Sequence, residues 1–260
     1  MTNLQDLTKE RLTVENVGGL TVLPVSERPE IINILVYGDP GVGKTVLAGS
    51  ASVVERMAPV LVIDVEGGTL SLRNTYPDVD VVRVETWADM QKVYDALYDG
   101  TVPYKTVVLD SLTEIQKFSM YNIMHELLKT DPGRDPDVPG MREWGKNIEQ
   151  CRRLIRAFRD LPINTIITAL AKQDRDSRTG VTKTSPSLSG KMANEVAGFL
   201  DVATYMYTKI VPVPESQPEV KRLLLTQPTD AIVAKDRTGR LPQIVEEPTM
   251  AALCESIFNN

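Results

Sequence analysis

Short, uninterrupted apolar runs alternate along most of this chain with segments whose apolar residues recur every three or four positions. Runs bounded by polar or turn-forming residues occupy residues 31–37, 60–64, 79–84, 106–110 and 163–169. Runs of this length and composition are typical of strands that are buried on both faces of a parallel sheet. The pattern therefore predicts a series of buried strands.

The segments between these runs have the apolar spacing of helices that pack on one face. We expect helices over residues 46–57, 87–97, 112–128, 141–160 and 191–200. Thr86 and Asp89 have the spacing of a capping pair at the start of the second helix. Because strands alternate with helices, the chain predicts an α/β fold with a mostly parallel sheet flanked by helices.

Three further strands are expected near the C-terminus without helices between them, at residues 202–210, 220–226 and 231–235, and they predict an antiparallel extension of the sheet. Residues 130–140 contain three prolines and two glycines and predict irregular structure, whereas residues 172–190 lack an apolar period and predict a mobile loop. We expect residues 1–29 to form an N-terminal arm, with a short strand near 20–23, and residues 30–260 to form one domain.

The length and amino-acid composition limit the classes of protein to which this chain can belong. A chain of 260 residues with 42% hydrophobic content can fill the core of one α/β domain. The N-terminus does not resemble a signal peptide, and no apolar run has the length of a membrane span, so we expect a cytoplasmic protein without membrane contact. Cys151 and Cys254 are predicted to be buried free thiols, and the presence of one histidine excludes histidine-centred catalytic triads and zinc clusters. The net charge of −6 argues against a protein that coats duplex DNA.

The segment between the first strand and the first helix matches the phosphate-binding (Walker A) pattern G-x-x-x-x-G-K-[ST]. Its glycines allow backbone N–H groups to surround a phosphate, Lys44 is expected to reach the β- and γ-phosphates, and the Thr45 hydroxyl is expected to bind Mg²⁺. The strand–loop–helix context is the one that this motif requires, so the chain is predicted to bind Mg²⁺ and a nucleoside triphosphate. The predicted nucleotide-binding residues are Gly38, Asp39, Pro40, Gly41, Val42, Gly43, Lys44, Thr45 and Val46.

Two of the apolar runs end in carboxylates. Ligands of open α/β sheets bind at the C-terminal ends of the strands, so Asp110 is the predicted partner of Thr45 at the metal ion. Glu66 follows another strand end and is the predicted base that orients and deprotonates water beside the γ-phosphate. The alternative is that Asp64 caps a turn while Glu66 is a solvated surface residue.

Two other pairs of polar residues follow predicted strands. Lys172 or Gln173 is a candidate sensor of the γ-phosphate, with a plain surface turn as the alternative. Lys235 and Arg237 share a face in an extended conformation and are candidates for stabilising phosphate charge in a neighbouring subunit. The alternative for this second pair is a charged turn.

The order of these elements resembles the RecA-like P-loop ATPases, and most closely the phage proteins of the Sak single-strand annealing group. The resemblance covers roughly residues 30–240. It comprises the phosphate-binding pattern, a strand ending in Asp-x-Glu-Gly-Gly, a strand ending in Leu-Asp-Ser, the Pro/Gly-rich segment, the later polar segment and a terminal Lys-Asp-Arg-x-Gly. Related phage proteins often carry a histidine near Leu170, and none stands there in this chain.

The resemblance implies a phage-encoded ATPase of the host cytoplasm that converts ATP and water to ADP and phosphate, binds single-stranded DNA and promotes annealing or recombination. Glu66 matches the catalytic glutamate of the family, and Lys235 with Arg237 resembles cations that contact ATP across a subunit interface. The protein would then be a homo-oligomer with ATP between its subunits. Residues 130–140 and 173–189 resemble the two DNA-facing loops.

The charge and the aromatic content of these two loops give weaker evidence about the binding partner than the resemblance does. From Lys172 to Lys191, five cationic side chains and two aspartates give a net charge of +3, which suits contact with a nucleic-acid backbone. Neither loop contains an aromatic residue for base stacking. A P-loop ATPase switch that acts on a protein partner is the main alternative. A small-molecule phosphotransferase is disfavoured because it would need an arginine-rich lid.

Overall fold

The computed structural model describes residues 16–27, 30–175, 180–212 and 217–259. The chain divides into two compact units, Met1–Glu30 and Ile31–Asn260. Within the first unit, β1 (Asn16–Val17) and β2 (Leu20–Thr21) form an antiparallel pair, and η1 (Val25–Glu27) is a short 3₁₀ helix. Gly18 and Gly19 both have positive φ, which allows the tight turn between the two strands.

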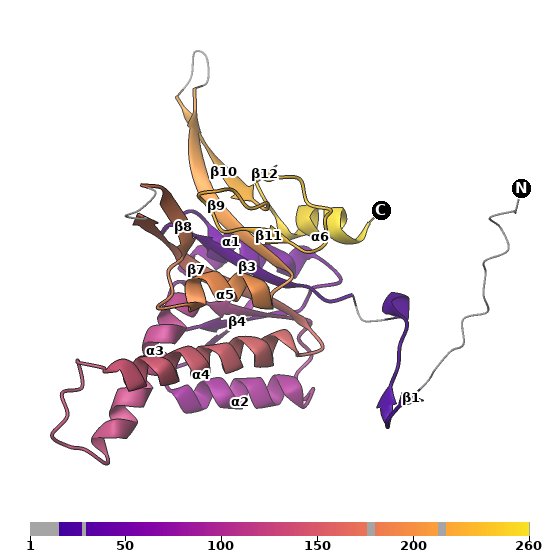
Figure 1. Cartoon of the computed structure of the whole chain (residues 1–260). Coiled ribbons are helices and arrows are strands. Elements are labelled where there is room, and N and C mark those ends of the chain that lie inside the picture. Colours follow the sequence, from indigo (N-terminus) through magenta and orange to yellow (C-terminus); the bar gives the residue numbers. More distant parts are fainter. Residues whose placement is uncertain (1–15, 28–29, 176–179, 213–216, 260) are drawn as a thin grey trace, which may run out of the picture. The chain divides into compact units, whose positions relative to one another are not determined.

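The second unit is built on one mixed sheet (Figure 1). Its path through hydrogen-bonded neighbours is β12–β10–β9–β3–β7–β6–β4–β5, and all pairs from β9 to β5 are parallel. These parallel strands are β3 (Asn33–Gly38), β4 (Val60–Asp64), β5 (Asp80–Arg83), β6 (Thr106–Asp110), β7 (Asn164–Arg175) and β9 (Val202–Val211).

The remaining strands pair antiparallel with the sheet. They are β8 (Thr182–Pro186) on β7, β10 (Glu219–Leu225) and β11 (Lys235–Asp236) on β9, and β12 (Ile244–Glu246) on β10. Figure 1 shows the β9–β10 ribbon extending away from the body of the sheet. The predicted architecture is therefore confirmed: an α/β fold with a mostly parallel sheet, flanking helices and an antiparallel C-terminal extension.

Two apolar cores cover the two faces of the sheet. One contains side chains of α2 (Trp87–Tyr98), α3 (Leu112–Leu128), α4 (Met141–Arg159) and α5 (Met192–Phe199). The other contains side chains of α1 (Lys44–Gly49) and α6 (Met250–Phe258), with η2 (Ser50–Val53) and η3 (Thr69–Leu72) on the same side. Burial of these faces explains the helical apolar spacing.

Several local predictions are confirmed. Thr86 and Asp89 form a reciprocal capping box at the start of α2. Cys151 and Cys254 are buried free thiols. Residues 130–140 contain no helix or strand.

Of the helices in the described ranges, none is long and apolar enough to cross a membrane.

The prediction of a mobile loop over residues 172–190 is wrong. β7 continues to Arg175 and forms an antiparallel pair with β8, so most of the described segment is strand, while residues 176–179 lie outside the described part of the chain. The burial of β7 changes from complete to exposed along its length. Beyond the core, this part of β7 is held by backbone hydrogen bonds to β8. Such a strand does not need regularly spaced apolar residues, so the sequence pattern did not predict it.

Two predicted elements have the wrong extent. The helix over residues 46–57 ends as α1 at Gly49, where Ser50 Oγ donates to the Leu47 carbonyl and accepts from the Met250 amide, and η2 follows. The strand over residues 231–235 is reduced to β11, because Ile232 pairs with Thr184 in a single bridge instead of continuing a ladder. In both places a contact distant in sequence decides the boundary.

Candidate nucleotide-binding site

The phosphate-binding segment joins β3 to α1 at the C-terminal edge of the sheet. Gly41 and Gly43 have φ values of 80° and 106°, which favour glycine. Gly38 lies directly against β9, since a Cβ atom built on it would stand 2.2 Å from the Met206 carbonyl oxygen. The glycines of the motif thus serve both the backbone conformation and the close approach of the neighbouring strand.

Lys44 is buried in this segment, with 9% of its surface exposed. Its Nζ atom donates to the carbonyl oxygens of Gly38 at 3.1 Å and Asp39 at 2.9 Å, so the ammonium group is held inside the loop. Burial lowers the pKa of Lys44, while the nearby carboxylates of Glu66 and Asp110 act in the opposite direction. The lysine is therefore a desolvated cation with carboxylates around it.

Thr45 and Asp110 meet across the sheet edge. Thr45 Oγ1 donates a hydrogen bond of 2.9 Å to Asp110 Oδ2, and Thr168 Oγ1 donates to Asp110 Oδ1. Thr168 comes from β7, which lies between β3 and β6. Sequence reasoning missed Thr168, because only the strand order reveals that β7 lies beside Asp110.

These oxygens fit a magnesium ion. Mg²⁺ prefers carboxylate and hydroxyl oxygen ligands, and it usually keeps several positions for water or phosphate oxygens. Thr45 and Asp110 provide such oxygens next to the phosphate-binding segment, within hydrogen-bond distance of each other. The structure thus brings together the two residues that the sequence assigned to the metal.

Glu66 lies beside Asp110 in the fold. β4 pairs with β6 so that Asp64 is opposite Asp110, and the chain then continues to Glu66, whose Oε1 atom accepts a hydrogen bond from Ser111 Oγ. The carboxylate of Asp64 instead accepts from the Gly67 amide at 2.7 Å and from Thr69 Oγ1 at 3.3 Å. Asp64 caps the turn and Glu66 is exposed, as the alternative interpretation supposed, but Glu66 also contacts Ser111, the residue that follows Asp110.

Lys172 and Gln173 lie further along β7. Lys172 Nζ forms an ion pair with Asp174 at 3.0 Å, and Gln173 is an exposed residue in register with Thr184 of β8. Two positions before Lys172, the Leu170 amide donates to Thr113 Oγ1 of α3 at 3.0 Å. The two residues therefore belong to the β7–β8 ladder, and a sensor role for either one stays a prediction.

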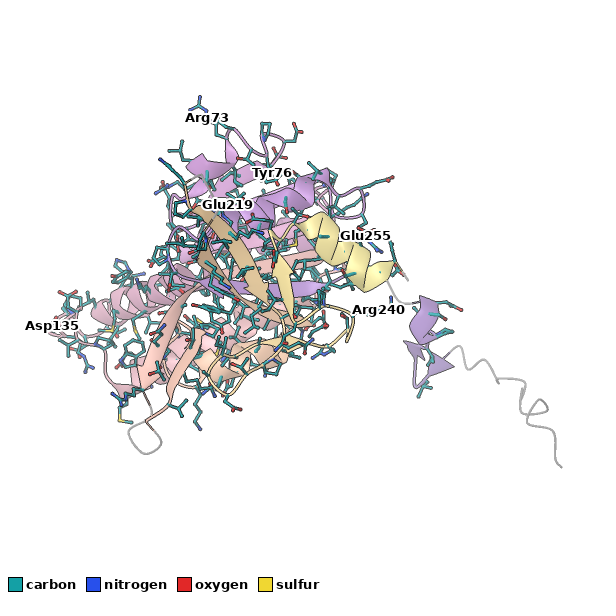
Figure 2. All side chains as sticks on the ribbon, turned by 90° about the horizontal axis from the view of Figure 1, so that it is seen from above. Arg73, Tyr76, Asp135, Glu219, Arg240 and Glu255 are labelled. Carbon is teal, nitrogen blue, oxygen red and sulfur yellow. The ribbon has the colours of Figure 1, made fainter. Side chains whose placement is uncertain are left out.

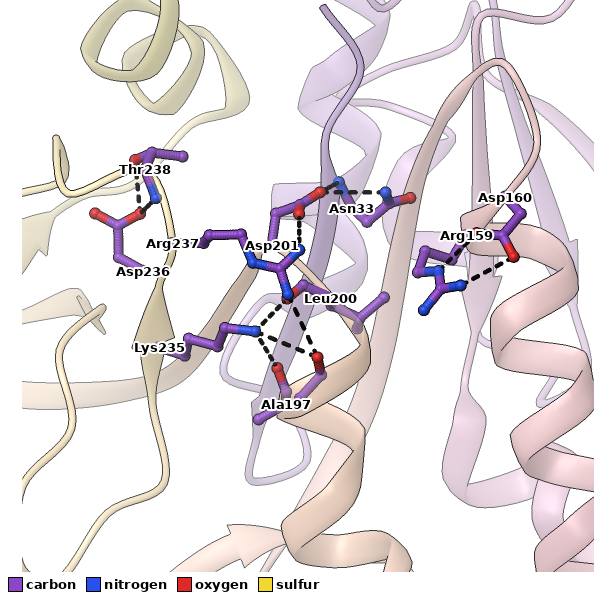
Figure 3. Close-up of polar contacts among 11 residues, drawn as sticks. Asn33, Arg159, Asp160, Ala197, Leu200, Asp201, Lys235, Asp236, Arg237 and Thr238 are labelled. Carbon is purple, nitrogen blue, oxygen red and sulfur yellow. Dashed lines mark hydrogen bonds and ion pairs between the residues drawn. The ribbon is translucent and has the colours of Figure 1, made fainter. Parts of the chain in front are cut away.

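Lys235 and Arg237 converge on the end of α5 (Figure 3). Lys235 Nζ donates to the carbonyl oxygens of Ala197 at 3.0 Å and Leu200 at 2.7 Å. Arg237 Nη1 pairs with Asp201 at 2.7 Å, and its side chain remains 56% exposed. The structure brings the two cations together as the sequence predicted, on groups of their own chain, and a contact with a neighbouring subunit stays a prediction.

One cation near the phosphate-binding segment was absent from the sequence prediction. A Cβ atom built on Gly43 would lie 3.2 Å from Arg222 Nε, so the Arg222 side chain of β10 covers this glycine. Arg222 lies in β10, whose sequence contains no recognised motif. Nothing in the sequence around Arg222 indicates that it lies near the phosphate-binding segment. The antiparallel β9–β10 pair creates this proximity.

A family model described as an AAA domain matches residues 31–238. The chain belongs to the AAA domain family. The match begins just before β3 and ends just after β11, so the AAA domain includes the phosphate-binding segment, Glu66, Asp110 and Arg237.

Similar solved structures include three proteins of low sequence identity. The KaiC-like protein PH0186 from Pyrococcus horikoshii OT3 is 15% identical, with a TM-score of 0.43 over 75% of this chain and 77% of that one. An ATPase from the type III secretion system of pathogenic bacteria is 15% identical, with a TM-score of 0.43 over 68% of this chain and 52% of its own. The Legionella pneumophila ATPase DotB is 11% identical, with a TM-score of 0.33 over 78% of this chain and 49% of its own. No curated protein matches the chain.

A groove of about 550 Å³ lies on the α3 side of the sheet. It is bordered by both segments that were predicted to face DNA, through Pro136, Asp137 and Pro139 and through Ser187 to Ser189. Two aromatic side chains from outside those segments also line it, Tyr121 of α3 and Trp144 of α4. Asp135 marks the outer end of the connection between these helices (Figure 2).

Proposed function

We propose that this AAA domain protein binds Mg²⁺-ATP and hydrolyses it to ADP and phosphate, binds single-stranded DNA, and promotes annealing or recombination. The observation that carries the ATPase part is the meeting of Thr45, Asp110 and Glu66 at one sheet edge beside Lys44. A metal-binding oxygen pair, a buried cation and a carboxylate base are the groups that phosphoryl transfer to water requires.

The residues of the chain have distinct roles in this proposal. The backbone of the segment from Gly38 to Thr45 and the ammonium group of Lys44 hold the triphosphate. Ser111 Oγ donates to one oxygen of Glu66, which leaves the second oxygen to accept a proton from water. Thr168 and Thr45 orient the two oxygens of Asp110. Magnesium, when bound, neutralises charge on the phosphate oxygens.

The proposal of a DNA partner is supported by the groove between α3, α4 and β8. Tyr121 and Trp144 provide the aromatic surfaces for base stacking that the two predicted loops lack. Gln116 lines the groove, and its Nε2 atom is buried without a hydrogen-bond partner among the described residues. Lys117 and Lys172 also line the groove.

The proposal extends to a homo-oligomer with ATP at its subunit interfaces. The exposed side chain of Arg237 supports a contact with phosphate bound by a neighbour, together with Lys235. The position of Lys172 in the groove suits a link between nucleotide and partner, and Gln173 is the alternative sensor. The two buried free cysteines support action in a reducing cytoplasm, which would be that of the host if the protein is phage-encoded.

A second candidate function is an ATPase switch that acts on a protein partner. It is favoured by the apolar and acidic surface at the outer end of the groove. Val138 and Met141 are 60% and 93% exposed, and the adjacent residues 130–140 carry three aspartates and one arginine. Such a surface suits a protein better than a nucleic-acid backbone.

The ATPase rate with and without a single-stranded oligonucleotide, at low and at moderate salt, separates the two candidates. The DNA proposal expects stimulation that weakens as salt rises. Tyr121→Ala should reduce this stimulation, whereas Tyr98→Ala is a matched control, because Tyr98 is equally exposed, at 66% against 68%, and lies on α2 away from the groove. An unstimulated ATPase that binds no oligonucleotide would contradict the DNA proposal and leave the ATPase proposal standing.

A further inference from the structure

Arg222 lies in the middle of β10, on the face of the sheet that carries α1. It is directly opposite Thr208 of β9, and the neighbouring pair on that face is Leu224 with Met206. Both Leu224 and Met206 belong to the core that contains α1. Because side chains alternate along a strand, Arg222 projects to the same side as these two residues.

This position brings Arg222 onto the phosphate-binding segment. A Cβ atom on Gly43 would lie 3.2 Å from Arg222 Nε and 3.4 Å from its Cδ. Gly43 immediately precedes Lys44, so the two cationic side chains approach the same short stretch of backbone. Arg222 is held in β10, which pairs with β9 along the whole length of β10, so its position does not depend on a long loop.

The Arg222 guanidinium group is not neutralised within the described part of the chain. Its backbone is fixed, since its amide donates to Glu247 Oε1 at 2.7 Å and its carbonyl accepts from the Glu247 amide at 2.8 Å. No described residue forms an ion pair or hydrogen bond with the guanidinium itself. The neighbouring cation, Lys221, pairs with Glu246 at 3.4 Å on the other face of the strand.

We propose that Arg222 binds the diphosphate portion of the nucleotide held by its own subunit. This inference rests on the proposed nucleotide binding and adds a residue that no motif identifies. A guanidinium group presents paired N–H donors that match phosphate oxygens.

The order of the strands in the sheet indicates which phosphates of the nucleotide Arg222 contacts. Arg222 approaches Gly43 from the β9–β10 side of β3, whereas Asp110 and Glu66 approach from the β6–β4 side, beyond β7. The residues assigned to the metal and to water therefore lie across the phosphate-binding segment from Arg222. This places Arg222 on the phosphates that ADP and ATP share.

The test measures the affinities of ADP and of ATP by calorimetry, with all ATP measurements in a Glu66→Gln background that slows hydrolysis. Arg222→Ala should weaken both ligands about tenfold, the loss of one charge-assisted hydrogen bond, and Arg222→Lys should weaken them less because it keeps the charge. Lys221→Ala is the matched control from the same strand and should change neither affinity. Thermal unfolding of each variant checks that the fold is retained, and Arg222→Gln provides a second variant that keeps most of the side-chain stem.

Each outcome is decisive. Affinities of folded Arg222→Ala and Arg222→Gln that equal those of the unaltered protein overturn the inference while the proposed function stands. A loss confined to ATP overturns the assignment to the diphosphate. Failure of the unaltered protein to bind either nucleotide overturns the proposed function itself. At sub-saturating ATP, mixing Lys44→Ala with Arg222→Ala subunits should give no more turnover than the two variants give separately, because each active site then lacks a residue of its own subunit, and a gain in the mixture would contradict action within one subunit.

Discussion

Thr45 Oγ1 and Asp110 Oδ2 lie 2.9 Å apart although 65 positions separate them in the chain. The contact requires that β3 and β6 end at the same edge of the sheet, with only β7 between them. β7 contributes Thr168, whose hydroxyl donates to the other oxygen of Asp110. Asp110 is thus oriented from α1 and from β7 before any ligand binds. Such preorganisation favours a site that acts on charged groups.

Replacing Glu66 by Gln should abolish most of the hydrolysis while leaving ATP bound. An amide cannot accept the proton of water, so the rate should fall at least about 100-fold, with little change in nucleotide affinity. Phosphate release and equilibrium binding measure the two effects. Glu85→Gln is the control, because Glu85 is an exposed carboxylate whose nearest cation is Arg83 at 3.9 Å. A Glu66→Gln variant with wild-type turnover would show that Glu66 is not the catalytic base.

Thr45→Ala should weaken the magnesium-dependent part of nucleotide binding. With the metal present, ATP affinity should fall about tenfold, since one oxygen ligand is lost, whereas affinity in the presence of a chelator should hardly change. Titration with and without magnesium gives the comparison. Thr75→Ala, a surface threonine whose hydroxyl bonds only to the Ser71 carbonyl among the described contacts, should behave as wild type. Equal losses in both conditions would argue against metal binding by Thr45.

Lys235→Ala should destabilise the fold. The ammonium group satisfies carbonyl oxygens at the end of α5, and its loss should lower the free energy of unfolding by about 1–3 kcal/mol. Urea denaturation measures this change. Lys209→Ala, which removes an exposed lysine from β9, should have little effect. If the two variants are equally stable, the contacts at α5 contribute nothing measurable.

Arg237→Ala tests action between subunits. If Arg237 contacts phosphate bound by a neighbour, a mixture of Lys44→Ala and Arg237→Ala subunits should recover turnover above that of either variant alone, because some interfaces regain both residues. Oligomers should first be shown to contain both variants by mass measurement. Absence of recovery in such mixed oligomers would confine Arg237 to its ion pair with Asp201.

Gly38→Ala should destabilise the protein even though alanine could adopt a strand conformation. The new Cβ would lie 2.2 Å from the Met206 carbonyl oxygen, a backbone atom held in the sheet, and the resulting shift should cost about 2 kcal/mol or more. Gly145→Ala is the contrasting control, since it lies within α4 with open space around it and should stabilise the helix by about 0.5–1 kcal/mol. Thermal and urea unfolding check both signs. A stable Gly38→Ala variant would show that β9 can move away from β3.

The sequence predicted the succession of core strands along the chain and the phosphate-binding segment, and it pointed to Thr45, Asp110 and Glu66, which the structure brings together. These depend on local patterns: apolar runs, turn-forming glycines, and polar residues that follow buried strands. Local patterns did not predict the elements whose presence or extent depends on backbone groups distant in sequence. β8 is mostly polar and forms because β7 offers its edge, and Ser50 ends α1 by bonding to Met250.

Only the tertiary structure decided which residues support that site. Ser111 holds Glu66, Thr168 holds Asp110, and Arg222 covers Gly43, yet none of these residues stands in a recognisable spacing with its partner. Each relationship arises from strand order and register, which bring side chains together across several strands. Sequence periodicity records which face of an element is buried, but it does not record which strand lies beside it, because sheet neighbours are chosen by the packing of the whole chain.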